Sequence, residues 1–170
     1  MKLGFRYTRT IILLILGILS LSLQGSINGL SLYFGVAVLT SAAMTLIYVF
    51  LHFDEHMARE IIIEMLVDGF SGLIIFTYPH SDNQFFTIVF SFWIFVMGVL
   101  MLTSGLLNKQ NKDFLWGYIL LGIFFLVSAF SIMHVTEESA DILSYFIGFV
   151  LVIYSVAQLW LIAKRKQEIY

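Results

Sequence analysis

Six long apolar segments set the limits on what this chain can fold into. They cover about residues 8–24, 30–51, 61–78, 85–107, 114–134 and 142–163, and most charged residues lie in the short stretches between them. The hydrocarbon core of a bilayer is about 30 Å thick, so a helix needs about 20 apolar residues to cross it. Each segment comes close to that length. The sequence therefore predicts an all-α polytopic membrane protein with six transmembrane helices.

The composition excludes several other classes of protein. Only 12% of the 170 residues are charged, whereas soluble domains carry about 25%. Strands of membrane β-barrels alternate apolar and polar residues over about ten positions, and these segments are continuously apolar. The chain has no cysteine, so it cannot form disulfides or thiolate metal sites. Its net charge of −2 gives no support to nucleic-acid binding.

The first apolar segment follows basic residues, as in a signal peptide. The run ends in "LSLQGSINGL", which lacks a small-x-small cleavage site. We therefore expect this segment to be retained as the first transmembrane helix.

The basic residues indicate how the chain is oriented. All nine fall on one side of a six-helix arrangement, and the loops on the other side contain none. Cytoplasmic loops of membrane proteins carry the excess of Lys and Arg, so both termini are expected in the cytoplasm. The nine residues are Lys2, Arg6, Arg9, Arg59, Lys109, Lys112, Lys164, Arg165 and Lys166.

A repeat of about 56 residues divides the single membrane domain, residues 1–170, into three tandem helical hairpins. The hairpins cover about residues 8–51, 61–107 and 114–163. Small residues recur at matching places in all three, and they allow helix backbones to approach closely. We therefore expect them to face neighbouring helices. They are Gly17, Gly72 and Ser128 in the first helix of each hairpin, and Ala42, Gly98 and Ser155 in the second.

The stretch "VDGFSGLIIFTYP" carries an acid–glycine pair at Asp68 and Gly69, then Gly72 and Pro79. This pattern resembles the repeat of the HdeD-like family of small bacterial membrane proteins. The stretch "WGYILLG", residues 116–122, is similar to the start of that family's third repeat. The resemblance extends over about residues 10–163. It implies a multi-pass protein of the bacterial inner membrane, associated with acid or envelope stress resistance and without an established catalytic activity.

Two carboxylates interrupt the third segment. With Glu60, Glu64 and Asp68 form one stripe on a helix, and Asp68 lies about 10 Å beyond Ile61 at 1.5 Å per residue. We expect all nine basic residues to lie at the membrane flanks, which leaves Asp68 without a cationic partner at its depth. An ionised Asp at the bilayer centre costs about 2.5–3.5 kcal/mol, and burial favours a neutral carboxyl group. We therefore expect Asp68 to be neutral and to face the interior of the bundle.

Two interpretations of these carboxylates stay open. In the structural one, Asp68 joins helices through hydrogen bonds to hydroxyl groups, and Asp68→Asn is nearly neutral for stability. In the functional one, Asp68 and Glu64 form a proton or cation site in a small transporter or channel. A dry, filled interior beside Asp68 would favour the structural interpretation. The hydroxyl groups considered as partners are those of Ser71, Thr103, Ser104 and Ser128.

The four histidines lie near the ends of the segments. His52 and His56 are spaced i, i+4, which suits a metal on a helix, but a polar connecting segment explains them as well. His80 and His134 occupy similar places in two repeats and could charge in an acidic periplasm. Ordinary polar loops carry the same residues, so we expect neither a metal nor a cofactor.

The sequence contains no recognisable catalytic motif. The longest loop, about residues 52–60, is too short to hold a soluble catalytic domain. We therefore expect a non-enzymatic inner-membrane protein whose immediate partner is the lipid bilayer. A second copy of the chain or another membrane protein stays open as a further partner, and no substrate is indicated.

Overall fold

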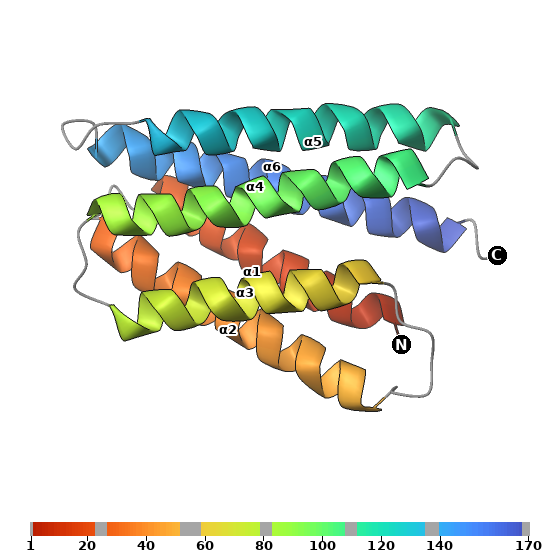
Figure 1. The fold of residues 1–170 in the computed structure, drawn as a ribbon, viewed down its shortest axis with the longest axis horizontal. Coiled ribbons are helices and arrows are strands. Elements are labelled where there is room, and N and C mark those ends of the chain that lie inside the picture. Colours follow the sequence, from red (N-terminus) through yellow and green to blue (C-terminus); the bar gives the residue numbers. More distant parts are fainter. Residues whose placement is uncertain are drawn as a thin grey trace.

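The computed structural model describes residues 2–22, 27–51, 59–78, 83–107, 112–134 and 140–167. Over these residues the chain forms six α-helices that run alongside one another as a bundle (Figure 1). The predicted all-α fold with six helices is confirmed. The helices are α1 (Lys2–Ser22), α2 (Ile27–Leu51), α3 (Arg59–Thr77), α4 (Asn83–Leu107), α5 (Lys112–Met133) and α6 (Ala140–Gln167).

Four of the helices contain a stretch that is long and apolar enough to cross a membrane. The other two differ from them: α1 offers the shorter apolar stretch Tyr7–Ser22, and α3 carries Glu64 and Asp68 beyond the charged residues at its start. That all six helices cross the membrane therefore stays a prediction. The four stretches are Gly29–Leu51, Gln84–Leu106, Trp116–Met133 and Leu143–Ala163.

The helices that pack most extensively against each other are not the two helices of one predicted hairpin. The most extensive packing joins α2 with α3, α4 with α5, and α1 with α6. Consecutive helices within one predicted hairpin, such as α3 and α4, pack less extensively. The first and last helices of the chain thus lie against each other, and α1 begins at the end of the bundle where α6 ends (Figure 1).

Glycines lie where these paired helices come closest. A Cβ atom on Gly98 of α4 would lie 3.1 Å from the carbonyl oxygen of Gly122 in α5. One on Gly17 of α1 would lie 3.1 Å from the carbonyl oxygen of Gly148 in α6, and one on Gly72 of α3 would lie 2.5 Å from a leucine side chain of α2. The three glycines therefore face neighbouring helices, as the sequence predicts.

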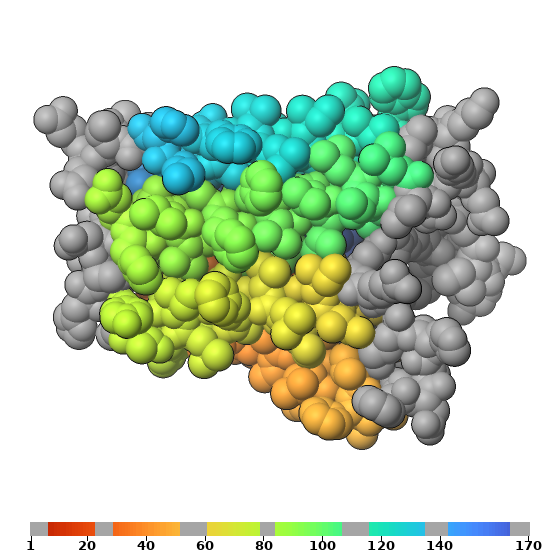
Figure 2. Space-filling model, viewed as in Figure 1, coloured from red at the N-terminus to blue at the C-terminus, as the bar shows by residue number. Residues whose placement is uncertain are grey.

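Aromatic side chains fill one half of the interior. Phe34 of α2 and Phe86 and Phe90 of α4 are fully buried near the starts of their helices. The ring of Phe34 lies edge-on to both, with centroids 5.9 and 5.2 Å away. Trp93 extends this cluster, with its ring centroid 5.3 Å from that of Phe34. The rings occupy the half of the bundle that lies away from the start of α1. In the space-filling view, α5, α4 and α3 lie side by side on one face of the molecule (Figure 2).

Candidate functional site

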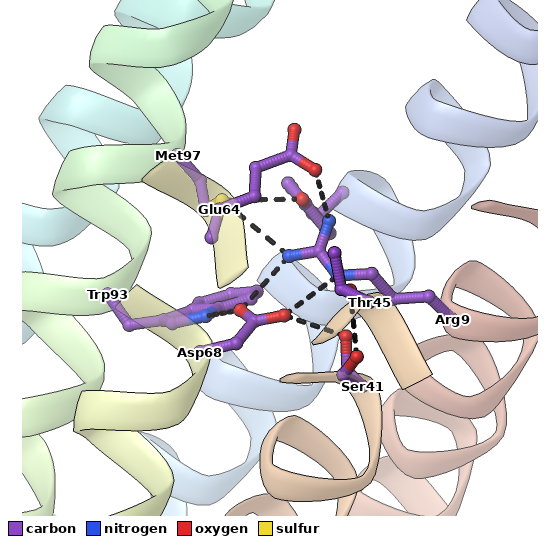
Figure 3. A network of polar contacts seen from close by, with 8 residues as sticks. Arg9, Ser41, Thr45, Glu64, Asp68, Trp93 and Met97 are labelled. Atoms are coloured by element: carbon purple, nitrogen blue, oxygen red, sulfur yellow. Dashed lines mark hydrogen bonds and ion pairs between the residues drawn. The ribbon is translucent and has the colours of Figure 1, made fainter. Parts of the chain in front are cut away.

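A network of polar side chains lies in the other half of the interior, next to Trp93. Five helices contribute to it, so it joins segments from the start to the end of the chain (Figure 3). Its members are Arg9 of α1, Ser41 and Thr45 of α2, Glu64 and Asp68 of α3, Trp93 and Met97 of α4, and Tyr154 of α6.

Arg9 bridges the two carboxylates of α3. Its Nε donates to Oδ2 of Asp68 at 2.9 Å and its Nη2 donates to Oδ1 at 3.0 Å. The remaining arm, Nη1, donates to Oε2 of Glu64 at 3.0 Å. Two parallel N–H···O bonds between a guanidinium and a carboxylate form the strongest and most directional kind of ion pair. Arg9 is 5% exposed and Asp68 1%, so this pair is removed from solvent.

Asp68 accepts two more hydrogen bonds from neighbouring helices. The Ser41 hydroxyl donates to Oδ2 at 2.7 Å, and the Trp93 indole N–H donates to Oδ1 at 2.8 Å. Each oxygen therefore accepts two bonds, which matches the acceptor capacity of an ionised carboxylate. The four donors fix the position of Asp68 and surround it with positive or partly positive hydrogen atoms.

The prediction that no basic residue reaches the depth of Asp68 is wrong, and the reason for expecting a neutral Asp68 is removed with it. Helix α1 begins at Lys2, so Arg9 lies about two turns inside it rather than before it. The sequence did hold a signal, because the apolar segment 8–24 already contained Arg9 and the acids of the third segment lacked a partner.

The predicted hydroxyl partners of Asp68 are wrong as well. Its hydroxyl partner is Ser41 of α2, which was not among the residues considered. Ser71, one turn further along α3, is buried and its Oγ has no hydrogen-bond partner in the described part of the chain. The structural interpretation survives in a changed form: Asp68 does join helices, but through an ion pair as well as hydroxyl and indole groups.

Contacts with a methionine sulfur and with aromatic rings surround the ion pair. The Met97 sulfur lies 3.8 Å from Nη2 of Arg9 and accepts a bond from the Tyr154 hydroxyl at 3.5 Å. The rings of Trp93 and Tyr154 meet edge-on with centroids 5.2 Å apart. Glu64 is the most open member of the charged group, with 17% of its side chain exposed against 1% for Asp68.

The interpretation of the four histidines as ordinary polar residues near the helix ends stays largely untested. His52, His56 and His80 lie outside the described residues. His134 is exposed at the end of α5, with Nδ1 2.7 Å from the carbonyl oxygen of Phe130. Within the described ranges, no three His, Asp or Glu side chains are grouped so as to hold a metal ion.

Residues 63–134 match the model of a short repeat of unknown function (DUF308). The match covers most of α3 and all of α4 and α5, which is less than half of the chain. This repeat is typical of small membrane proteins. No curated protein and no solved structure shows significant similarity to the chain.

Proposed function

We propose that this chain is a non-enzymatic, multi-pass protein of the bacterial inner membrane, of the HdeD-like type, whose interior is held together by the Arg9 network. The single observation that carries the proposal is the paired, buried charge of Arg9 and Asp68. A buried carboxylate that accepts four hydrogen bonds is arranged to hold helices in place rather than to react. The apolar helices and the matched repeat support the membrane setting.

A role in acid or envelope stress resistance is part of this proposal. It rests on the resemblance of "VDGFSGLIIFTYP" to the HdeD-like repeat and on the repeat match over residues 63–134. A bundle closed by aromatic rings and an internal ion pair suits a protein that must keep its shape when the environment changes.

The proposed topology places both termini in the cytoplasm. With Arg9 assigned to the interior, the seven other basic residues of the described ranges lie near the helix ends where α1 begins and α6 ends. Lys112 is the first residue of α5 and Arg59 is the first residue of α3, both at that end. The excess of basic residues on one side supports this orientation.

A small transporter or channel is the second candidate, and one observation favours it. Two carboxylates share a single guanidinium, so the group of Arg9, Glu64 and Asp68 carries a formal charge of −1 when all three are ionised. A proton or a small cation would balance that charge. Because Asp68 is saturated with donors and more deeply buried, Glu64 is the residue that such a transporter would use. The aromatic cluster at Phe34 and Phe90 speaks against an open path through the bundle.

Survival of bacteria under acid challenge, measured together with thermal stability in detergent, tests these proposals. The variants are Asp68→Asn, which removes the central acceptor, and Glu64→Gln, which removes only the outer one. If the network is structural, protection and stability fall together, and most strongly in Asp68→Asn. A Glu64→Gln protein that is as stable as the parent but no longer protects would favour the transporter. Parent cells that survive no better than cells without the protein would refute the stress role.

A further inference from the structure

Within the described residues, the helices that carry the charged group are the two without a stretch long and apolar enough to cross a membrane. α1 supplies Arg9, and α3 supplies Glu64 and Asp68. Neither helix is among the four whose length and composition suffice to cross a membrane. The residues that weaken the membrane preference of α3 are thus the ones that Arg9 contacts.

The contact between these two helices is made by side chains. The helices α1 and α3 do not pack extensively against each other. Helix α1 lies mainly against α6, and α3 lies mainly against α2. The long side chain of Arg9 reaches across this separation and places both edges of its guanidinium on the carboxylates of α3 (Figure 3). Apolar packing between α1 and α3 therefore contributes little to holding them together.

Each helix alone would place unpaired charge in the hydrocarbon region. Charged residues within transmembrane segments are costly unless they face the protein interior and pair with one another. In α3 the cost falls on two carboxylates, and removing the partner of a buried charge leaves that charge uncompensated. A helix of this composition can therefore cross the membrane stably only when a cation is supplied from elsewhere in the chain.

We propose that Arg9 is the residue that allows α3 to span the membrane, so that α1 and α3 complete their insertion as a charge-matched pair. This inference rests on the proposed six-span topology. It assigns to Arg9 a role in the insertion of a helix that begins about 50 residues further along the chain.

Single-cysteine labelling of the whole protein tests the proposal, because the chain contains no cysteine of its own. Ser81→Cys, between α3 and α4, reports whether α3 has crossed. Ser26→Cys, between α1 and α2, is the matched control for α1. Spheroplasts are treated with a membrane-impermeant maleimide, and labelling is expressed relative to lysed spheroplasts, so that differences in protein amount cancel.

In the otherwise unchanged protein, both cysteines are labelled from outside. Adding Arg9→Leu lowers the labelling at position 81 by about tenfold or more, because the carboxylates of α3 lose their partner. Labelling at position 26 is unchanged, because α1 becomes more apolar. Combining Arg9→Leu with Glu64→Gln and Asp68→Asn restores labelling at position 81, because no unpaired charge is left.

Three outcomes overturn the inference, and they differ in whether the proposed six-span topology is refuted as well. Full labelling at position 81 in the Arg9→Leu protein refutes the role of Arg9 and leaves the six-span topology standing. If the triple variant Arg9→Leu, Glu64→Gln, Asp68→Asn does not restore labelling at position 81, charge matching is refuted as the cause. The same holds if the Arg9→Leu protein does not accumulate in the membrane and the triple variant does not accumulate either. A lack of external labelling at position 81 in the unchanged protein refutes the six-span topology itself, and the inference with it.

Discussion

The guanidinium of Arg9 lies edge-on to the carboxylate of Asp68, with Nε 2.9 Å from Oδ2 and Nη2 3.0 Å from Oδ1. The two residues are 59 positions apart in the chain. Serine and indole donors from two more helices complete the surroundings of the carboxylate. Replacing one donor therefore removes a hydrogen bond from the buried Asp68, and replacing Asp68 leaves all three donor residues without this acceptor.

Asp68→Asn is expected to lower the free energy of unfolding by about 3 kcal/mol, at the low end of the range for breaking a buried ion pair, because Glu64 still faces Arg9. The amide also places an N–H₂ group where an oxygen accepts bonds from other donors. Thermal or denaturant unfolding in detergent measures the loss.

Glu64→Gln is the comparison for that variant, since it removes the more exposed carboxylate and keeps the Arg9–Asp68 pair. Its loss of stability should be clearly smaller. Equal losses for the two variants, or an Asn variant as stable as the parent, would contradict the central place given to Asp68.

Trp93→Phe should cost about 1.5–3 kcal/mol of stability beyond the change in packing, because Asp68 loses a donor to a charged group. The benzene ring keeps most of the edge-on contacts with Phe34 and Tyr154. Trp116→Phe is the matched control, since Trp116 is 66% exposed and should change stability by less than about 0.5 kcal/mol. Similar unfolding of the two variants would show that the indole bond contributes nothing measurable.

Gly98→Ala should destabilise the protein by about 1–3 kcal/mol, the usual cost of overpacking. The added methyl group would lie 3.1 Å from the carbonyl oxygen of Gly122, and backbone atoms cannot rotate away as a side chain can. Gly69→Ala is the control within the same bundle, because its methyl group would meet only the Cβ of Ala42 at an ordinary 3.6 Å. That change should be neutral or stabilising, as Ala favours a helix by about 1 kcal/mol over Gly. The reverse order of the two variants would overturn the assigned α4–α5 contact.

Reporter fusions after Tyr170 should be active with a cytoplasmic reporter and silent with a periplasmic one. The expectation follows from the basic residues that flank the helices at the end where α6 finishes. A periplasmic signal at that site would contradict the proposed topology, in either its orientation or its even number of spans.

The sequence by itself determined the helices and much of their spacing. Long apolar runs bounded by polar residues predict helices from local information alone, so the predicted starts and ends of α2 to α5 agree with the structure within three residues. The glycines at positions 17, 72 and 98 were likewise expected at helix contacts, because a small side chain in such a helix favours close packing with a neighbour.

Only the tertiary structure decided which helices meet and which charges pair. The packing of α1 with α6 depends on contacts between distant parts of the chain, and the packing of α2 with α3 joins two different predicted hairpins. Helix periodicity contains neither. The role of Arg9 depends on two such facts, namely that α1 extends back to Lys2 and that a flexible side chain reaches α3 from there. From the sequence, Arg9 is one of several basic residues near a helix start. It becomes the partner of Asp68 because the fold brings α1, α2 and α4 around one buried carboxylate of α3, whose acceptor sites must be filled.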